Sequence, residues 1–219
     1  MKIRDRAMAS FLVVGAVLFS FSAPLSATVV DQNFATTDDP NHSTGLGIVT
    51  TALAQTFTVG VTGTLASVEF NVLKTSGTTG DLSFDIRSLV GGVPELLMAD
   101  ALTTSTISSS LINTAGGAWT TISVDVSAAN IAVATGDMFA FVLNSPIGES
   151  FSVQTDYTNA YAGGQRYSQN GDGNFFFGSF SADLAFKTTV TSVPEPTIIT
   201  LFALGLIGLG IARGRQKSA

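Results

Sequence analysis

Oxygen-bearing side chains alternate with glycines late in the chain. Asn170, Asp172 and Asn174 occupy every second position of the sequence Asn-Gly-Asp-Gly-Asn. This spacing is typical of calcium loops, although an EF-hand loop counted from Asn170 would end on a serine instead of an acidic residue. A calcium site would therefore need a distant ligand such as Asp156 or Asp183. A plain turn is the alternative, because Asn-Gly and Asp-Gly are favoured hairpin residues.

Three tyrosines and an arginine lie in the glycine-rich segment before this loop, at Tyr157, Tyr161, Arg166 and Tyr167. Aromatic faces beside an arginine suit stacking on sugar rings together with hydrogen bonds to hydroxyl groups. These residues are therefore candidate glycan contacts. The alternative is packing at strand edges, where tyrosine is common.

Catalytic chemistry has few candidates in this chain. The absence of cysteine excludes disulfide scaffolds, thiol catalysis and cysteine-based metal sites, and a single histidine excludes His-pair metal sites. That histidine, His42, lies beside Ser43 and near Asp38 and Asp39, but no Gly-x-Ser-x-Gly elbow accompanies them. We predict no catalytic residue and no enzymatic activity. A glycan hydrolase that uses two of the acidic residues is the alternative.

The elements that would position these side chains are short strands. Apolar residues alternate with polar ones in Leu65–Val72, Leu82–Arg87, Trp119–Val126 and Met138–Leu143, and glycine-rich turns bound these runs. This period is typical of half-buried strands. The sequence predicts an all-β fold, an antiparallel β-sandwich of the jelly-roll kind, over residues 28–192.

The N-terminal segment has the three parts of a secretory signal peptide. Lys2, Arg4 and Arg6 precede an apolar run over 11–21, and Leu25-Ser26-Ala27 ends in a small-x-small pattern. We predict that residues 1–27 are a signal peptide used by the Sec translocon and removed by signal peptidase.

The C-terminal segment has a matching organisation. Val193, Pro194, Glu195 and Pro196 precede an uncharged run over 197–212, and the basic tail 213–219 follows with Arg213, Arg215 and Lys217. Such a run would be about 24 Å long as a helix, a little under the ~30 Å thickness of the hydrocarbon core, and snorkelling Arg and Lys side chains together with local bilayer thinning can make up the difference. We predict a transmembrane helix whose basic end stays in the cytoplasm, with residues 28–196 outside.

This order of motif, apolar helix and basic tail resembles the PEP-CTERM sorting signal of Gram-negative bacteria that make extracellular polysaccharide. The resemblance covers residues 193–219. It implies recognition by an exosortase in the inner membrane, cleavage near the Pro-Glu-Pro, and transfer to the cell surface or the extracellular space. The two prolines keep the motif extended, which favours access by such an enzyme.

A second resemblance concerns the central domain. The segments Ala54–Phe57, Tyr161–Tyr167 and Asp183–Thr188 are similar to those of choice-of-anchor ectodomains, which are jelly rolls. This likeness implies a fold and no reaction.

Charge limits the partners of the central domain. Residues 28–192 contain four basic and 14 acidic residues, a net charge of −10. This balance opposes binding to nucleic acid or anionic lipid. The prediction is an exported structural or weakly glycan-binding module of a polysaccharide matrix, with calcium as a candidate cofactor. A secreted glycan hydrolase and a ligand-free matrix filler remain alternatives.

Overall fold

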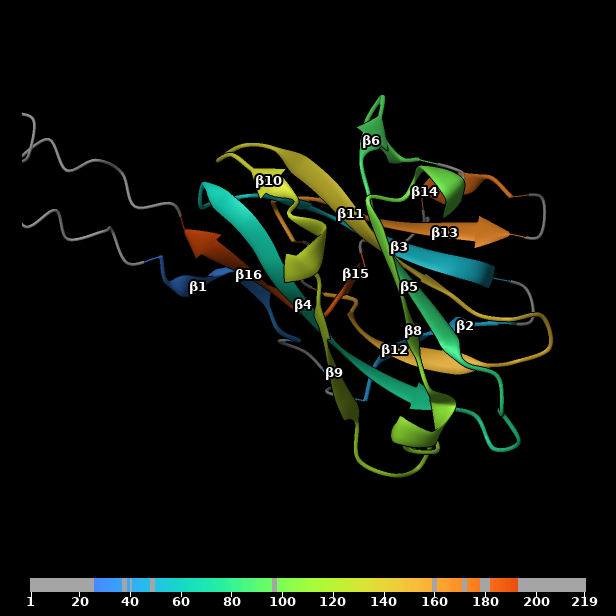
Figure 1. Cartoon of the computed structure of the whole chain (residues 1–219). Coiled ribbons are helices and arrows are strands. Elements are labelled where there is room, and N and C mark those ends of the chain that lie inside the picture. The colour runs from blue at the N-terminus through green and yellow to red at the C-terminus, as the bar shows by residue number, and fades with distance from the viewer. Residues whose placement is uncertain are drawn as a thin grey trace, which may run out of the picture.

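The computed structural model describes residues 26–36, 39, 41–47, 50–95, 98–158, 161–170, 173–177 and 182–192. In this part of the chain, two antiparallel sheets pack against each other, so the predicted all-β sandwich is confirmed (Figure 1). Almost all of the predicted signal peptide and the whole of 193–219 lie outside the described residues. Within the described ranges, no helix is both long enough and apolar enough to cross a membrane.

The larger sheet has the strand order β1-β16-β4-β12-β15, and three further strands pair beside this path. Its members are β1 (Thr28–Phe34), β2 (Ser43–Leu46), β4 (Gly63–Lys74), β9 (Thr120–Asp125), β10 (Ala132–Val133), β12 (Phe151–Asp156), β15 (Asp183–Leu184) and β16 (Phe186–Ser192). Strands β9 and β10 pair with β4, and β2 pairs with β12.

The smaller sheet has the order β14-β13-β3-β11-β5-β8. Its members are β3 (Thr50–Thr58), β5 (Leu82–Arg87), β8 (Thr103–Ile107), β11 (Met138–Asn144), β13 (Arg166–Asn170) and β14 (Phe175–Phe177). A two-stranded hairpin, β6 (Leu89–Val90) and β7 (Val93–Pro94), forms a ladder of its own and pairs with neither sheet. Helical structure among the described residues is limited to the 3-10 turns η1 (Met98–Asp100), η2 (Ser109–Leu111) and η3 (Ser127–Ala129).

The main core lies between the sheets and is rich in phenylalanine. Phe70, Phe84 and Phe141 stack with centroids 6.1 to 6.3 Å apart and nearly parallel rings. All three are at most 1% exposed. They come from β4, β5 and β11, at positions where alternation directs every second side chain inward.

The two ends of the described domain meet at one pole. Strands β1 and β16 pair antiparallel, with Thr28 opposite Thr191. The Ser192 backbone N–H and hydroxyl donate to the Ala27 carbonyl at 3.0 and 3.1 Å. Ala27, at the predicted signal-peptide junction, and Ser192, just before the predicted sorting segment, therefore lie side by side at the end of the sandwich where β1 and β16 pair (Figure 1).

Candidate functional site: a polar groove on the eight-stranded sheet

A row of polar side chains crosses three strands on the outer face of the larger sheet. Asn33 of β1 is opposite Lys187 of β16, and Lys187 is opposite Glu69 of β4. Directly opposite residues of antiparallel strands project to the same face of the sheet. The next row, one residue along, is Phe34, Phe186 and Phe70, and it faces the core. Period-two alternation thus puts a charged and amide row directly above a phenylalanine layer.

The sheet divides beside this row. Strand β16 pairs with β4 as far as Phe70, and β12 pairs with β4 from Val72 onward. Asn71 lies between these two stretches. At this point the Ala185 N–H donates to the Gln154 carbonyl at 3.0 Å, so β12 enters the sheet where β16 leaves it. The division leaves a depression instead of a continuous flat surface.

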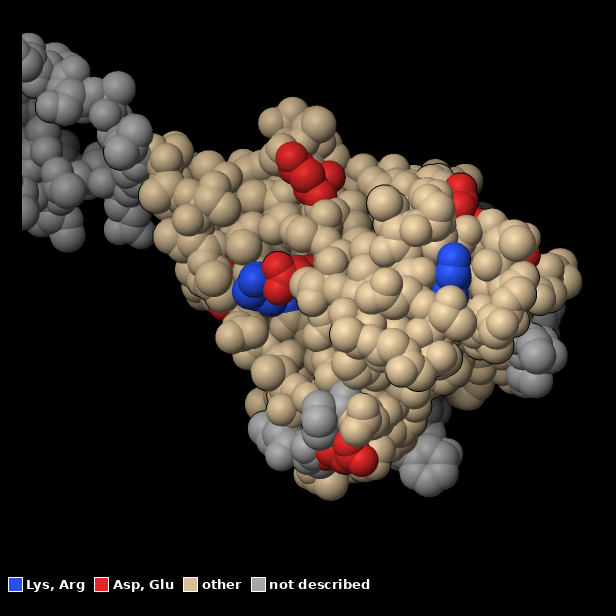
Figure 2. Space-filling view, turned by 90° about the horizontal axis from the view of Figure 1, so that it is seen from below, with Lys and Arg blue, Asp and Glu red and all other residues tan. Residues whose placement is uncertain are grey.

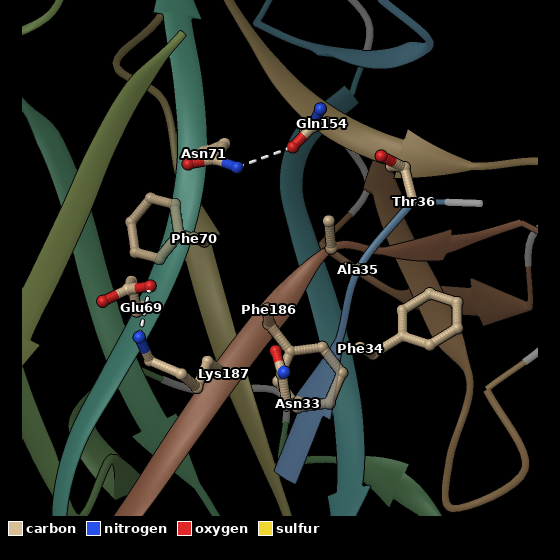
Figure 3. A pocket seen from close by; sticks show the side chains of 11 residues that line it. Asn33, Phe34, Ala35, Thr36, Glu69, Phe70, Asn71, Gln154, Phe186 and Lys187 are labelled. Atoms are coloured by element: carbon tan, nitrogen blue, oxygen red, sulfur yellow. Dashed lines mark hydrogen bonds and ion pairs between the residues drawn. The ribbon is translucent and has the colours of Figure 1, made fainter. Parts of the chain in front are cut away.

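This depression is a groove of about 190 Å³ (Figure 3). The residues that form it are Asn33, Phe34, Ala35, Thr36, Glu69, Phe70, Asn71, Gln154, Ala185, Phe186 and Lys187. The Asn71 side-chain amide donates to Gln154 Oε1 at 2.6 Å, and the Thr121 hydroxyl donates to Asn71 Oδ1 at 2.7 Å. A side-chain amide has two hydrogens, so Asn71 retains a second donor on this face.

One ion pair crosses the groove. Lys187 Nζ lies 2.7 Å from Glu69 Oε1, and the two side chains are 32% and 30% exposed. Charge in the groove is therefore balanced locally. Among the described residues that line it, Glu69 is the only carboxylate.

The floor of the groove is apolar. Tyr161 packs edge-on against Phe186 with centroids 5.1 Å apart, and lies 5.6 Å from Phe34. Its hydroxyl donates to Gln32 Oε1 at 2.7 Å. Burial raises the pKa of Tyr161 to about 12, and the carboxylates of Asp31 and Asp183 add to this rise. Tyr161 is therefore a neutral packing residue under the groove.

The structure does not bring the four predicted glycan contacts onto one surface. Arg166 and Tyr167 are adjacent in β13, so their side chains point to opposite faces of the sheet. Arg166 lies between the sheets, 7% exposed, and donates to the Thr44 hydroxyl; Tyr167 is 4% exposed on the outer face. Tyr161 supports the groove from below. Only Tyr157, 37% exposed and edge-on to His42 at 5.2 Å, belongs to the surface.

The residues predicted to bind calcium are also separated. Asn170 and Asn174 flank the β13–β14 connection, where the Gly173 N–H donates to the Asn170 carbonyl at 3.0 Å, as in the predicted turn. Asp156 belongs to the other sheet, fully buried, and its Oδ1 accepts from the Thr158 N–H at 2.8 Å. Asp172 lies outside the described residues. The described ranges contain no group of three or more His, Asp or Glu side chains suited to a metal. Calcium binding stays a prediction.

Asp183 forms hydrogen bonds between the two sheets. Its Oδ1 accepts from the Gln55 side-chain amide at 2.9 Å, and its Oδ2 accepts from the Tyr161 N–H at 2.9 Å. Gln55 also accepts from the Leu184 N–H at 2.9 Å. These buried bonds join the two sheets and hold Tyr161 in place under the groove. Gly164 packs closely against β3 next to Gln55, and a Cβ there would collide with the Thr56 carbonyl.

Sequence reasoning missed the groove residues themselves. Asn33, Asn71, Gln154 and Lys187 come from four strands that are distant in sequence. Each is simply a polar position in an alternating run. Only the register of the strands brings them together.

The comparisons concern mainly the end of the chain. The family model of the PEP-CTERM protein-sorting motif matches residues 192–216, which include the Pro-Glu-Pro, the apolar run and the first basic residues. The chain is a PEP-CTERM protein. The motif supports an exported surface protein that is processed by an exosortase. The matched range of this PEP-CTERM protein begins at Ser192, which is also the last residue of β16.

Similarity beyond the motif is distant. No curated protein matches the PEP-CTERM protein. One solved structure contains the cysteine protease and lectin-like domains of Cwp84, a surface layer associated protein of Clostridium difficile. It shares 12% identity with this chain, with a TM-score of 0.44, over 71% of this chain and 37% of the other.

Proposed function

We propose that this PEP-CTERM protein is a non-enzymatic component of an extracellular polysaccharide matrix, and that its sandwich binds polysaccharide in the groove described above. The observation that carries the proposal is the groove lining. Asn33, Thr36 and Asn71 offer amide and hydroxyl groups beside the Glu69–Lys187 pair. Such groups exchange hydrogen bonds with sugar hydroxyls in both directions.

The charge of the domain favours a glycan without acidic groups. All four basic residues of 28–192 are engaged: Lys187 pairs with Glu69, Arg87 pairs with Asp85, Lys74 Nζ donates to the Ser109 carbonyl at 2.7 Å, and Arg166 is buried. Charged side chains are sparse on the face seen in Figure 2, and no broad blue area is present there. An acidic polymer carries the same sign of charge as the domain, so the two would repel each other.

Affinity is expected to be weak. The three phenylalanines that line the groove are 8%, 1% and 3% exposed, so none offers a stacking platform. Binding therefore depends on hydrogen bonds, each of which contributes on the order of 1 kcal/mol. Many copies acting along one polymer would compensate for weak single sites.

The test is cosedimentation of full-length protein, purified in detergent, with the polysaccharide of the cells that export it, fractionated by charge. We expect binding to the neutral fraction. The paired change Asn71→Ala with Gln154→Ala should weaken it on the order of tenfold, because two hydrogen-bonding groups are lost. Thr104→Ala, on the exposed edge strand of the other sheet, is the matched control and should leave binding unchanged.

A reducing-sugar assay on the same samples separates binding from hydrolysis. If the protein releases reducing sugar ends, and a single Asp or Glu substitution abolishes this release, the protein is a glycan hydrolase instead. Equal sedimentation of the wild type and the paired variant would remove the groove from the proposal.

A further inference from the structure

We propose that a second pocket, under the β6–β7 hairpin, binds a sugar unit with a free amino group. The pocket lies on the outer face of the six-stranded sheet, where a small second core has formed. Its members are Ala52, Ala54, Val142, Tyr167 and Phe175, with Val93 of the hairpin packed against them. This inference does not rest on the polysaccharide groove, which belongs to the other sheet.

A buried ion pair holds the walls of this pocket together. Arg87 Nη2 lies 2.6 Å from Asp85 Oδ2, and both side chains are at most 1% exposed. The Arg87 Nη1 donates to the Glu95 carbonyl at 2.9 Å, and the guanidinium lies over the Phe175 ring, 5.8 Å from its centroid. Asn144 donates to the same Asp85 oxygen at 3.0 Å. Arg87 therefore links β5, the segment after the hairpin, and β14 through one side chain.

Such a pair is not needed for stability alone. Taking two charges out of water costs several kcal/mol, and apolar residues of similar size are often at least as stabilising. What the pair provides here is a fixed geometry between three segments that are distant in sequence. That geometry defines the pocket.

The pocket has a volume of about 460 Å³, which is within the range of small-molecule sites. Its lining includes the apolar residues Val90, Val93, Pro94 and Phe175. It also includes the polar residues Glu95, Asp100 and Asn174. An apolar lining with a few polar groups is the usual form of a site for an organic ligand.

Charge selects the ligand class. Glu95 and Asp100 line the pocket without a basic residue among its described lining, and Arg87 behind them is already paired with Asp85. The pocket is therefore suited to a cation. Two carboxylates and an amide are too few for calcium, which takes about six to eight oxygens.

An amino sugar combines the features that the pocket requires. Its ammonium group would contact Glu95 and Asp100, its hydroxyls would reach Asn174, and the C–H face of its ring would pack against Pro94 and Phe175. The domain charge of −10 supports the same class, because a polymer with free amines would be attracted from a distance.

The test is calorimetric titration of the full-length protein in detergent with a β-1,4-linked glucosamine tetramer, compared with its N-acetylated counterpart. We expect binding of the amine form alone, weakened by added salt. The paired change Glu95→Gln with Asp100→Asn should reduce affinity about tenfold. Asp125→Asn, a carboxylate elsewhere on the surface, is the matched control and should have no effect.

Several outcomes would overturn the proposal. These are equal binding of both tetramers, an unchanged affinity in the Glu95/Asp100 variant, heat from calcium alone that this variant abolishes, or tighter binding of a lysine peptide than of the tetramer. The groove variant Asn71→Ala with Gln154→Ala separates the two sites. If it abolishes tetramer binding while the Glu95/Asp100 variant does not, the amine binds in the groove, and this proposal fails while the groove stands.

Discussion

On the outer face of the eight-stranded sheet, Lys187 and Glu69 form an ion pair 2.7 Å apart with side chains 32% and 30% exposed. On the outer face of the six-stranded sheet, Arg87 and Asp85 form one 2.6 Å apart with side chains 1% and 0% exposed. The geometry is nearly the same, but the surroundings differ. The hairpin and β14 cover the second pair, whereas the first remains in contact with solvent.

This difference decides what each pair contributes. Solvent screens the exposed pair, so its attraction is worth little, and it is free to exchange hydrogen bonds with a ligand. The buried pair is hardly screened, and loss of either partner would leave an uncompensated charge. The first belongs to the proposed recognition surface, and the second fixes the architecture around a pocket.

The largest expected effect comes from removal of the buried cation. Arg87→Met should lower the free energy of unfolding by about 3 to 5 kcal/mol, because Asp85 would be left charged and buried. Urea denaturation followed by circular dichroism measures this loss. The double change with Asp85→Leu should recover most of it. A loss below about 1 kcal/mol for Arg87→Met would mean that the pocket walls do not depend on this pair.

An intermediate effect is expected under the groove at alkaline pH. The pKa of Tyr161 is raised to about 12 from an unfolded value of 10.0. A raised folded pKa gives stability that is fully present below pH 10 and is lost as the pH rises toward 12. This difference between the folded and unfolded pKa corresponds to at most about 2.7 kcal/mol of the free energy of unfolding. Because Tyr161 is partly exposed, we expect a loss of only about 1 kcal/mol.

Urea denaturation at several pH values between about 9 and 12 tests this expectation, because this range spans the unfolded and folded pKa values of Tyr161. Tyr161→Phe should have a lower stability at neutral pH, because the bond to Gln32 is lost, but a flatter decline in this range. Parallel declines in the two proteins would show that other groups cause the alkaline loss.

The smallest effect is expected for the exposed pair. Lys187→Met should change the free energy of unfolding by only about 0 to 1 kcal/mol. The aliphatic stem of methionine retains the packing of lysine while the charge is removed. The same denaturation experiment measures the change. A loss comparable to that of Arg87→Met would contradict the contrast between the two faces.

The sequence predicted the core better than either site. Alternation in Leu65–Val72 and Leu82–Arg87 assigned the inward positions, and Phe70 and Phe84 do meet in the core. It also placed Asp85 and Arg87 on one face of their strand, since residues two apart project to the same side. It gave no sign that this face would be covered, because the cover comes from the hairpin and from β14, which is about 90 residues away in the chain.

The predicted tyrosine surface illustrates the opposite case. Tyr157, Tyr161, Arg166 and Tyr167 are close in sequence, but the chain changes sheets between the first and the last of them. Proximity in sequence is a poor guide once adjacent residues of a strand face opposite sides. The hydrogen bonds of Gln55 and Asp183 between the sheets could not be predicted either, because they join residues 128 positions apart.

The sequence by itself determined the destination of this PEP-CTERM protein, through a motif whose residues are contiguous, and it determined the class of the fold, through the period of its apolar residues. Only the tertiary structure decided which polar residues share a groove and which charges are hidden. A contiguous motif can be recognised in a single segment of chain, so its residues are sufficient. A groove depends on strand register and burial, which arise only when distant segments pack together.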